Sequence, residues 1–348
     1  MIEKYYNGVI EQVAGGIGNV EHNSILVRYS NDFSIWDLES VNHYKDQTDI
    51  FFTCHEFSYN KIAEAYEPYL GLIRQMFHKY CSGTLEEFME ECDVYKLQRP
   101  VFESYFEKGF CERTEQILID EVEYEQERMH SSIVTMLQKL SEICPIVIVL
   151  NRFQLASKST MQLTNRLLQT KNKNIGIVLG VNDVQSIPEF AHEEWDAICE
   201  SMDDRNMVYH IGNAGRNMEP DVMDYYSDYE SDDGYRKLNN LVYFLDFDQA
   251  DHHLSKIERR IKFDNFTISE KKHYQLLLLQ IMVSVLQRDI AKALESCEDL
   301  EKLQDQEKEG AFYYNFWMAT SYMYLGKLEE AMIYVQKAKE CGEALGCL

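Results

Sequence analysis

The chain has 348 residues, of which 45% are hydrophobic and 12% aromatic. This composition excludes an intrinsically disordered protein and suits about two domains. Acidic side chains outnumber basic ones by 59 to 34, giving a formal net charge of −25. Such a surface repels nucleic-acid phosphates and anionic membranes, so we expect neither as a partner.

The nine cysteines include no C-x-x-C pair, so neither a disulfide framework nor a zinc site is indicated. Free thiols are typical of a reducing compartment. The first residues, MIEKYYNGVIEQ, lack the apolar core of a signal peptide. No apolar run approaches the ~20 residues of a membrane helix. We therefore expect a cytoplasmic protein.

The first elements along the chain are an amphipathic stretch within residues 1–22, two short apolar strands, and a run of helices. The glycines of 15–18 predict a loop after the amphipathic stretch. Pro68 is expected to break or kink the first of the later helices near its start. The predicted strands are Ser24–Val27 and Asp49–Cys54, and the predicted helices are Lys61–Tyr80, Leu85–Met89, Val101–Phe110 and one or two helices over Thr114–Leu140.

The strongest strand signal is Pro145–Leu150, which is continuously apolar and β-branched, as in a central strand covered on both faces. A helix over Ser159–Gln169 and a buried strand over Asn174–Gly180 follow it. Strand, helix and strand at this spacing predict a parallel β-α-β unit with a right-handed crossover. Met207–Ile211 and Leu241–Leu245 are candidates for further strands.

The most acidic segment spans residues 219–234 and contains seven carboxylates with no basic residue before Gly234. A calcium loop is one interpretation, but the carboxylates do not follow EF-hand register and Gly234 comes one position late. We therefore favour a solvated loop.

From Ile268 onward the pattern is helical. Tyr274–Leu286, Ile290–Leu303, Ala311–Leu325 and Leu328–Ala338 predict antiparallel hairpins joined by short turns. In the last pair, small and aromatic residues resemble those of a tetratricopeptide repeat (TPR): Ala319, Tyr322, Gly326, Ala331 and Ala338.

Within that repeat, we expect Gly326 to adopt a left-handed turn and Val335 to fill the apolar position between the two alanines. The preceding pair fits less well, because Arg288 stands at the turn where glycine is expected. The resemblance implies a protein partner, for which we select Asn315 and Tyr322. Since such repeats need neighbours and a cap, residues 263–348 are expected to be part of a longer array. An unrelated helical hairpin is the alternative.

Residues 143–157, ICPIVIVLNRFQLAS, resemble the Walker B region of the STAND branch of AAA-like signalling ATPases. In that family, a proline precedes an apolar strand that is followed by two acidic residues. The segment Tyr66–Ile73 is also similar to the family, and TPR arrays often follow such domains. The resemblance implies that residues 1–262 form an α/β domain with a parallel sheet and helices on both faces, followed by an all-α part, 263–348.

The catalytic positions implied by this resemblance are replaced. The two acidic residues that hold magnesium and activate water fall on Asn151 and Arg152, and a later aspartate falls on Ser157. Asparagine cannot match a carboxylate as a ligand for a hard cation, and arginine repels one. The arginine expected after the strand ending at Val181 is replaced by Asn182 and Asp183.

The phosphate-binding loop should follow Ser24–Val27. The chain offers RYSNDFSIWDL there, with none of the glycine or lysine that cradle phosphates. Phe33 and Trp36 are expected to crowd the phosphate site and Asp32 to repel a triphosphate. The residues that stand in the degenerate phosphate loop are Arg28, Asn31, Asp32, Ser34 and Trp36.

Two other groups of residues carry side chains that can bind metals or act as nucleophiles. His252 and His253 lie near acidic residues, but neighbouring side chains at an exposed helix start face different ways, so no metal site is predicted. Cys54 is followed by His55 and Glu56 at a strand end, where alternation separates the thiol from the imidazole. We interpret both groups as structural.

These observations favour a non-catalytic signalling or regulatory scaffold, with no cofactor required and ATP with magnesium disfavoured. An active STAND-type ATPase with an aberrant site is one alternative, and a purely structural TPR adaptor is another. The openness of the cleft above Val27 and Leu150 is expected to distinguish scaffold from adaptor.

Overall fold

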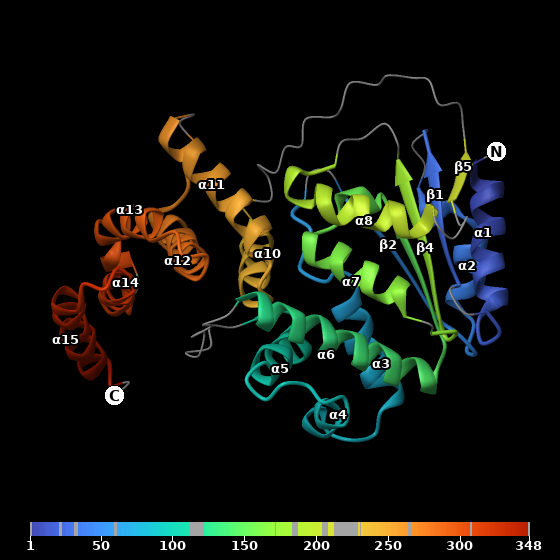
Figure 1. The fold of residues 1–348 in the computed structure, drawn as a ribbon, viewed down its shortest axis with the longest axis horizontal. Coiled ribbons are helices and arrows are strands. Elements are labelled where there is room, and N and C mark those ends of the chain that lie inside the picture. Colours follow the sequence, from blue (N-terminus) through green and yellow to red (C-terminus); the bar gives the residue numbers. More distant parts are fainter. Residues whose placement is uncertain are drawn as a thin grey trace. The chain divides into compact units, whose positions relative to one another are not determined.

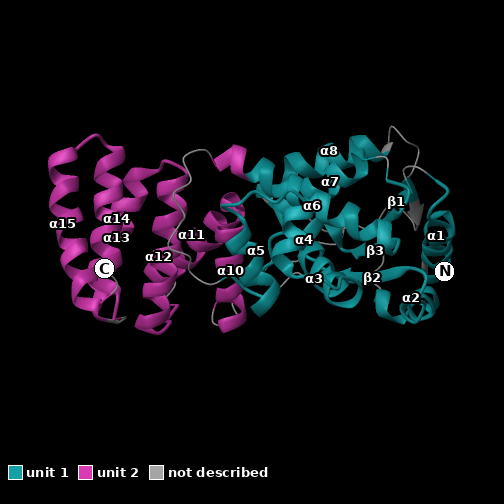
Figure 2. Cartoon of the chain, turned by 90° about the horizontal axis from the view of Figure 1, so that it is seen from below, with its two compact units in different colours: residues 1–114, 126–228 teal, residues 115–125, 229–348 magenta. Residues whose placement is uncertain are grey.

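The structure is a computed structural model. It describes residues 2–20, 23–30, 34–58, 61–111, 122–170, 172–182, 187–203, 208–211, 229, 231–263, 266–306 and 308–346. The chain divides into two compact units (Figure 2). Unit 1 comprises residues 1–114 and 126–228, and unit 2 comprises residues 115–125 and 229–348.

Unit 1 is built on a five-stranded sheet with the order β2-β3-β4-β1-β5, in which all neighbours are parallel (Figure 1). The strands correspond to the predicted apolar runs, so the parallel α/β part of the fold prediction is confirmed. Their bounds are β1 Ser24–Tyr29, β2 Phe51–Glu56, β3 Ile146–Asn151, β4 Ile175–Asn182 and β5 Val208–Ile211. Every residue of β3 and β4 is buried, as expected for central strands.

Helices cover both faces of this sheet. Helices α1 and α2 lie on one face, and α6, α7 and α8 lie on the other (Figure 1). Tyr6, Ile10 and Val13 of α1 share a core with Val149 and Val178 of the strands. Each such side chain stabilises the fold by about 1.5–3 kcal/mol through burial.

The helices of this unit are α1 Ile2–Gly16, η1 Ile35–Asp37, α2 Glu39–Lys45, α3 Tyr69–Tyr80, α4 Leu85–Glu91, α5 Arg99–Lys108, α6 Val122–Ile143 (in unit 1 from Gln126), η2 Phe153–Leu155, α7 Lys158–Gln169, η3 Glu189–Ala191 and α8 His192–Asp203. The sequence predicted neither α2 nor α8.

Two local predictions are wrong. The helix expected over Lys61–Tyr80 begins only at Tyr69, with Pro68 at its N-cap and Tyr66 at a positive φ of 56°. The expected break at Pro68 is confirmed, but the residues before it are not helical. The candidate strand Leu241–Leu245 lies mostly in a helix, α10 (Asp232–Tyr243). Its apolar run is buried by packing between helices rather than in a sheet.

A buried histidine in α6 gives unit 1 a pH dependence. His130 is 7% exposed and meets the ring of Tyr66 edge-on at 5.4 Å. Burial, with a smaller contribution from Arg166, lowers its pKa from 6.5 to about 4. The unfolded chain therefore takes up a proton at a higher pH than the folded chain does.

We expect the free energy of unfolding to fall by about 3 kcal/mol as the pH falls from 6.5 to about 4, with the full contribution present above 6.5. Replacing His130 with glutamine should remove this part of the slope. Urea unfolding of both proteins over this pH range measures it, and equal slopes would contradict the assignment.

Unit 2 is a series of helical hairpins. The helices predicted after Ile268 are present, and two more precede them. Their bounds are α10 Asp232–Tyr243, α11 Phe247–Phe263, α12 Glu270–Leu286, α13 Ile290–Glu301, η4 Gln304–Gln306, α14 Gly310–Tyr324 and α15 Leu328–Leu345. An all-α part therefore follows the α/β part, as predicted.

Three hairpin turns share one backbone geometry. Leu245, Arg288 and Gly326 each have a φ between 66° and 70°. The residue after each turn donates its N–H to a carbonyl five positions earlier, namely Asp246 to Leu241, Asp289 to Ser284 and Lys327 to Tyr322, at 2.8, 2.8 and 3.0 Å. This is the arrangement that closes a helix at a left-handed residue.

The same equivalence extends into the second helix of each hairpin. Ala250, Ala293 and Ala331 hold equivalent positions after the turn and are all buried. The pair α10–α11 is therefore a first hairpin that sequence analysis placed in the larger domain. Because α10 and α11 both pack against α12, they belong to unit 2, whose larger segment is residues 229–348.

The prediction for Val335 is wrong. It was expected to fill an apolar position between the buried alanines, but its side chain is 47% exposed. Ala331 and Ala338 are buried, whereas Val335, one helical turn from each of them, is not covered.

Candidate functional site

The topology of the sheet selects one edge for a site. The crossover from β1 runs towards β2, whereas the crossover from β4 runs the opposite way to β5. The neighbours β1 and β4 thus make a topological switch point, and ligands of open α/β sheets bind beside the carboxyl ends of strands at such a point. Arg28 and Asn151, which the sequence resemblance placed in a phosphate loop and a Walker B motif, lie near the carboxyl ends of β1 and β3.

A chain of polar contacts joins the carboxyl ends of three strands. Tyr29, the last residue of β1, donates its hydroxyl to Asn151 Oδ1 at the end of β3, at 2.7 Å. Asn151 Nδ2 donates to Glu56 Oε1 at the end of β2, at 3.3 Å. Arg152 Nε lies 3.6 Å from the same Glu56 oxygen. We call these four residues the strand-end network.

The Asn151 side chain is hydrogen-bonded through both its oxygen and its nitrogen within the strand-end network. Asn151 and Tyr29 are almost fully buried, and Asn151 accepts and donates within the network. Arg152 neutralises Glu56, the carboxylate that the structure brings to this position. A magnesium ion binds carboxylate oxygens. The carboxylate at this position, Glu56, is already engaged by Arg152 and Asn151.

Sequence analysis selected Asn151 and Arg152 but missed their partners. Tyr29 and Glu56 are the last residues of β1 and β2, and the carboxyl ends of parallel strands meet at one edge. Their place at the ends of predicted strands could therefore have indicated both residues from the sequence.

Gly180 in β4 makes room for the network. A Cβ at this position would lie 2.6 Å from Asn151 Oδ1 and closer still to Tyr6 Oη. Tyr6 comes from α1 and meets the ring of Tyr29 edge-on at 6.5 Å. Burial, followed by the neighbouring Tyr29, raises the pKa of Tyr6 well above its usual value, so it remains a neutral phenol at physiological pH.

The residues that the resemblance placed in the phosphate loop make contacts with other parts of unit 1. Arg28 Nη2 lies 3.1 Å from Cys199 Sγ, and its guanidinium lies 5.8 Å from the centre of the Trp195 ring. Ser34 caps η1 by accepting from Trp36 N at 3.3 Å. Trp36 is 45% exposed, with Lys45 Nζ 4.6 Å from its ring centre. Asn31, Asp32 and Phe33 lie outside the described residues.

Two further aligned positions have structural roles. Asn182, at the tip of β4, exchanges hydrogen bonds with the buried Gln154 at 3.4 and 3.5 Å. Ser157 caps α7 by accepting from Thr160 N at 3.1 Å. Asp183 lies outside the described residues.

The cysteine and histidine side chains considered as candidates have structural surroundings. Burial raises the pKa of Cys54 to about 11, so its thiol is protonated at neutral pH. His55 instead faces Glu67, with Nε2 3.4 Å from Oε1. His253 was expected at an exposed helix start, but it is buried in α11 and its Nδ1 lies 3.0 Å from Tyr229 Oη.

Of the acidic segment 219–234, residues 219–228 and Glu230 lie outside the described part. Asp232 and Asp233 begin α10, and Asp233 pairs with Arg236 and Lys237 at 3.0 and 3.1 Å. Among the described residues, no cluster of three or more histidine, cysteine or acidic side chains is arranged to hold a metal ion.

The two residues selected for partner binding pack inside the last hairpin. Tyr322 stacks on Tyr334 of α15 with ring centres 5.6 Å apart. Asn315 is buried and donates from Nδ2 to Ala311 O at 2.7 Å, with Cys341 Sγ at 4.0 Å. The Tyr322 ring and the contact between Asn315 and Cys341 therefore join α14 to α15, whereas the bond to Ala311 lies within α14.

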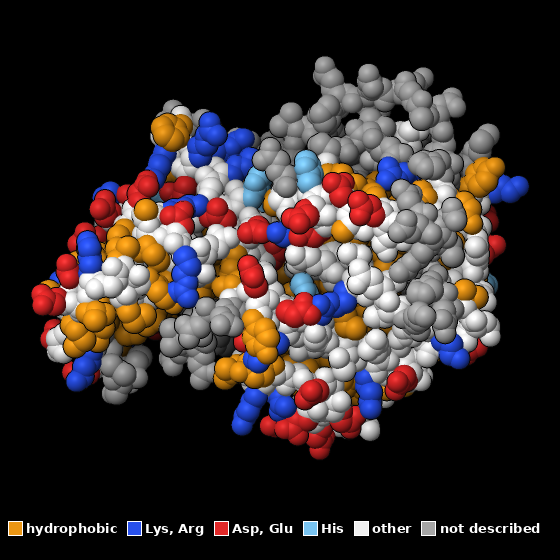
Figure 3. Space-filling view, viewed as in Figure 1, with side chains coloured by type: hydrophobic (Ala, Val, Ile, Leu, Met, Phe, Trp, Pro, Cys, Tyr) orange, Lys and Arg blue, Asp and Glu red, His pale blue; other side chains and the backbone are white. Residues whose placement is uncertain are grey.

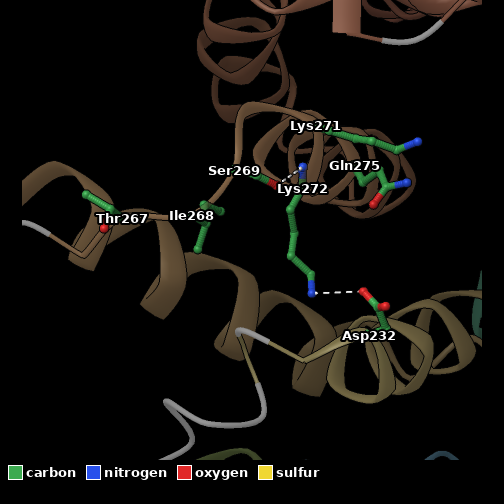
Figure 4. Close-up of a pocket in the computed structure, with 7 residues that line it drawn as sticks. All are labelled: Asp232, Thr267, Ile268, Ser269, Lys271, Lys272 and Gln275. Atoms are coloured by element: carbon green, nitrogen blue, oxygen red, sulfur yellow. Dashed lines mark hydrogen bonds and ion pairs between the residues drawn. The ribbon is translucent and has the colours of Figure 1, made fainter.

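A pocket of about 500 Å³ lies at the start of α12 (Figure 4). The Lys272 side chain crosses it, and its Nζ lies 3.3 Å from Asp232 Oδ1 of α10. Ser269 caps α12 by accepting a hydrogen bond from Lys272 N at 3.3 Å. These contacts link α10 to α12. The residues that line the pocket are Asp232, Thr267, Ile268, Ser269, Lys271, Lys272 and Gln275.

No helix within the described ranges combines the length and apolar character needed to cross a membrane. Comparison of the sequence with models of known protein families, and with curated proteins, gave no match.

Proposed function

We propose that the chain is a non-catalytic scaffold of the cytoplasm, in which a STAND-type α/β domain has lost ATP hydrolysis and TPR-like hairpins bind another protein. The observation that carries the proposal is the strand-end network. Asn151 and Arg152 stand where the resemblance implies magnesium carboxylates, and their contacts with Tyr29 and Glu56 hold strands together instead.

The order of the elements supports the same proposal. The segments aligned with the phosphate loop and Walker B lie at one edge of a parallel sheet, and stacked hairpins follow the sheet in the chain. The acidic net charge favours a protein partner over a nucleic acid or an anionic membrane. We propose no bound cofactor.

An active ATPase with an aberrant site is the second candidate, and Glu56 is the observation that favours it. This carboxylate lies at the same edge of the sheet, and its side chain is 13% exposed. It could hold magnesium only by giving up Arg152 and Asn151. A purely structural adaptor is the remaining alternative.

Calorimetric and thermal-shift titrations with ATP, ADP and GTP, with and without magnesium, test the proposal. We expect no ATP turnover above background. We also expect no thermal shift at millimolar nucleotide. A nucleotide present at 100 times its dissociation constant would add about 2.7 kcal/mol to stability, so binding would be visible as a clear shift. An ATPase of known activity, measured in parallel, is the control.

Micromolar ATP affinity with magnesium-dependent turnover would overturn the proposal in favour of the active ATPase. Magnesium-independent binding without turnover would retain the scaffold and add a nucleotide as a structural ligand.

A further inference from the structure

The first hairpin of unit 2, α10–α11, meets the two helices that follow it through charged side chains. We call this contact the first joint. Each pair across it combines an acidic side chain with a lysine or a histidine, at nitrogen–oxygen distances between 2.6 and 3.4 Å. The pairs are Asp232–Lys272, Asp251–Lys292, Glu258–His273, and Lys262 with both Glu295 and Asp299.

Asp251 of α11 is the centre of the first joint. Its Oδ1 accepts hydrogen bonds from Lys292 Nζ of α13 at 2.6 Å and from Gln280 Nε2 of α12 at 2.8 Å. Lys292 Nζ also donates to Ser255 Oγ of α11 at 2.8 Å. The Asp251 and Lys292 side chains are 30% and 31% exposed. These bonds therefore join three helices at a place where dissolved ions partly screen the attraction.

The contact between the second and third hairpins has a different character. Within the described residues, every ion pair that joins α12–α15 to another helix leads back to α10 or α11. Counted from the turns, the equivalent of Asp251 in α13 is the apolar Leu294. Figure 3 shows acidic and basic side chains side by side over α11 and α13, and hydrophobic side chains gathered over α14 and α15. Ion pairs between hairpins are thus concentrated at the first joint.

The first joint is also incompletely packed. It contains the pocket of about 500 Å³ at the start of α12, which the Lys272 side chain crosses to reach the fully exposed Asp232 (Figure 4). Leu254 and Ile257 of α11 add buried apolar surface to the hairpin. Apolar burial keeps the hairpin folded, whereas hydrated ion pairs and a pocket make its contact with α12 and α13 sensitive to charge and salt.

We propose that the first joint is a conformational device: α10–α11 separates from α12–α15 as one unit while the later hairpins stay folded, and the ion pairs hold it closed. This inference goes beyond the proposed function and does not depend on it. Because α10–α11 precedes the other hairpins in the chain, an open joint releases α12–α15 from the helices that follow the α/β part. High ionic strength favours the open state, and loss of Lys292 favours it further.

Hydrogen exchange of the full chain, followed by mass spectrometry of peptides from each helix, tests the proposal. Raising the NaCl concentration from about 0.1 M to about 1 M shortens the Debye length from about 10 Å to about 3 Å. We expect the amides of α10 and α11 to exchange about fivefold faster at the higher salt, and by the same factor in both helices. The amides of α14 and α15 should change by less than about twofold, because salt does not weaken apolar packing.

Lys292→Met removes the charge beside Asp251 but keeps an unbranched side chain. The amides of α10 and α11 should exchange about tenfold faster in this variant, because Asp251 loses its charge-assisted bond. Lys302→Met is the matched control, since Lys302 also pairs with an aspartate, Asp299, at 2.7 Å, but not across the joint. It should change exchange by less than about twofold in every helix. Circular dichroism should show both variants folded.

Equal acceleration of α10–α11 and α14–α15 by salt would show that unit 2 opens as a whole and would overturn the inference. Equal effects of the two lysine substitutions would overturn it as well. A double variant, Asp251→Leu with Lys292→Met, leaves no charge at the centre of the joint and should lose most of the salt response. A full salt response in the double variant would contradict the assignment. None of these results depends on ATP turnover, so the two proposals fail independently.

Discussion

Replacing Gly180 with alanine is expected to lower the free energy of unfolding of unit 1 by about 3 kcal/mol, the upper range for overpacking a rigid core. The added methyl would lie 2.6 Å from Asn151 Oδ1 and closer to Tyr6 Oη. Both neighbours are fully buried, and Tyr6 is also confined by the core under α1. Relief would require moving α1 or opening the hydrogen bond between Tyr29 and Asn151. Urea unfolding followed by fluorescence measures the loss.

Gly8→Ala is the control, because it makes the same change in the helix that carries Tyr6. No atom lies within 4 Å of a Cβ at Gly8. Alanine should therefore stabilise α1 by about 0.5–1 kcal/mol through its helix propensity. Equal effects of the two substitutions on the free energy of unfolding would show that the strand-end network does not require a glycine at position 180.

The parallel sheet could be predicted because its strands carry a local signal. Ile146–Leu150 and Ile175–Leu179 are apolar at successive positions, and the structure buries them on both faces. Gly326 was predicted for a similar reason, since a glycine after a helical period indicates a left-handed turn. Its φ of 70° confirms that prediction.

The first hairpin of unit 2 was missed because its turn lacks that local signal. Leu245 adopts the left-handed conformation, which costs roughly 1 kcal/mol for a residue with a Cβ. The packing of α10 and α11 against α12 fixes the turn in spite of this cost. The apolar run ending at Leu245 consequently resembled a strand. Arg288 takes the same conformation, and its guanidinium lies 4.0 Å from the centre of the Tyr324 ring.

The strand-end network was only half predictable for a different reason. The resemblance of residues 143–157 to a Walker B region selected Asn151 and Arg152, but their partners depend on which strands meet at one edge. The strand order brings β1 and β2 to opposite sides of β3 and β4. Tyr29 then reaches Asn151 past Gly180, which offers no side chain in between.

Placing a carboxylate at position 151, where the resemblance implies one, is expected to destabilise the protein rather than activate it. In Asn151→Asp, the amide that donates to Glu56 Oε1 at 3.3 Å becomes an acceptor. Two carboxylates then share one arginine, Arg152, in a buried position. We expect a loss of about 3 kcal/mol at pH 8, typical of a buried charge without its own partner. ATP turnover should stay at background.

The pH dependence of this variant has a definite sign. Burial and the neighbouring carboxylate raise the pKa of one acid in the folded state above its unfolded value of about 4. The unfolded chain then loses its proton first as the pH rises, so the variant becomes less stable above pH 4 and most of the loss is absent near pH 5. Urea unfolding of variant and wild type at pH 5 and pH 8 measures the difference.

A second substitution separates charge repulsion from lost shape. Glu56→Gln supplies an amide that can donate to the new carboxylate, which also keeps the Tyr29 hydroxyl as a donor. The double variant should therefore recover at least 2 kcal/mol of the loss at pH 8, a coupling expected only of groups in direct contact. If the double variant is no more stable than Asn151→Asp, repulsion from Glu56 is not the cause. If Asn151→Asp alone gains magnesium-dependent ATP turnover, the edge of the sheet retains a phosphate site and the scaffold proposal fails.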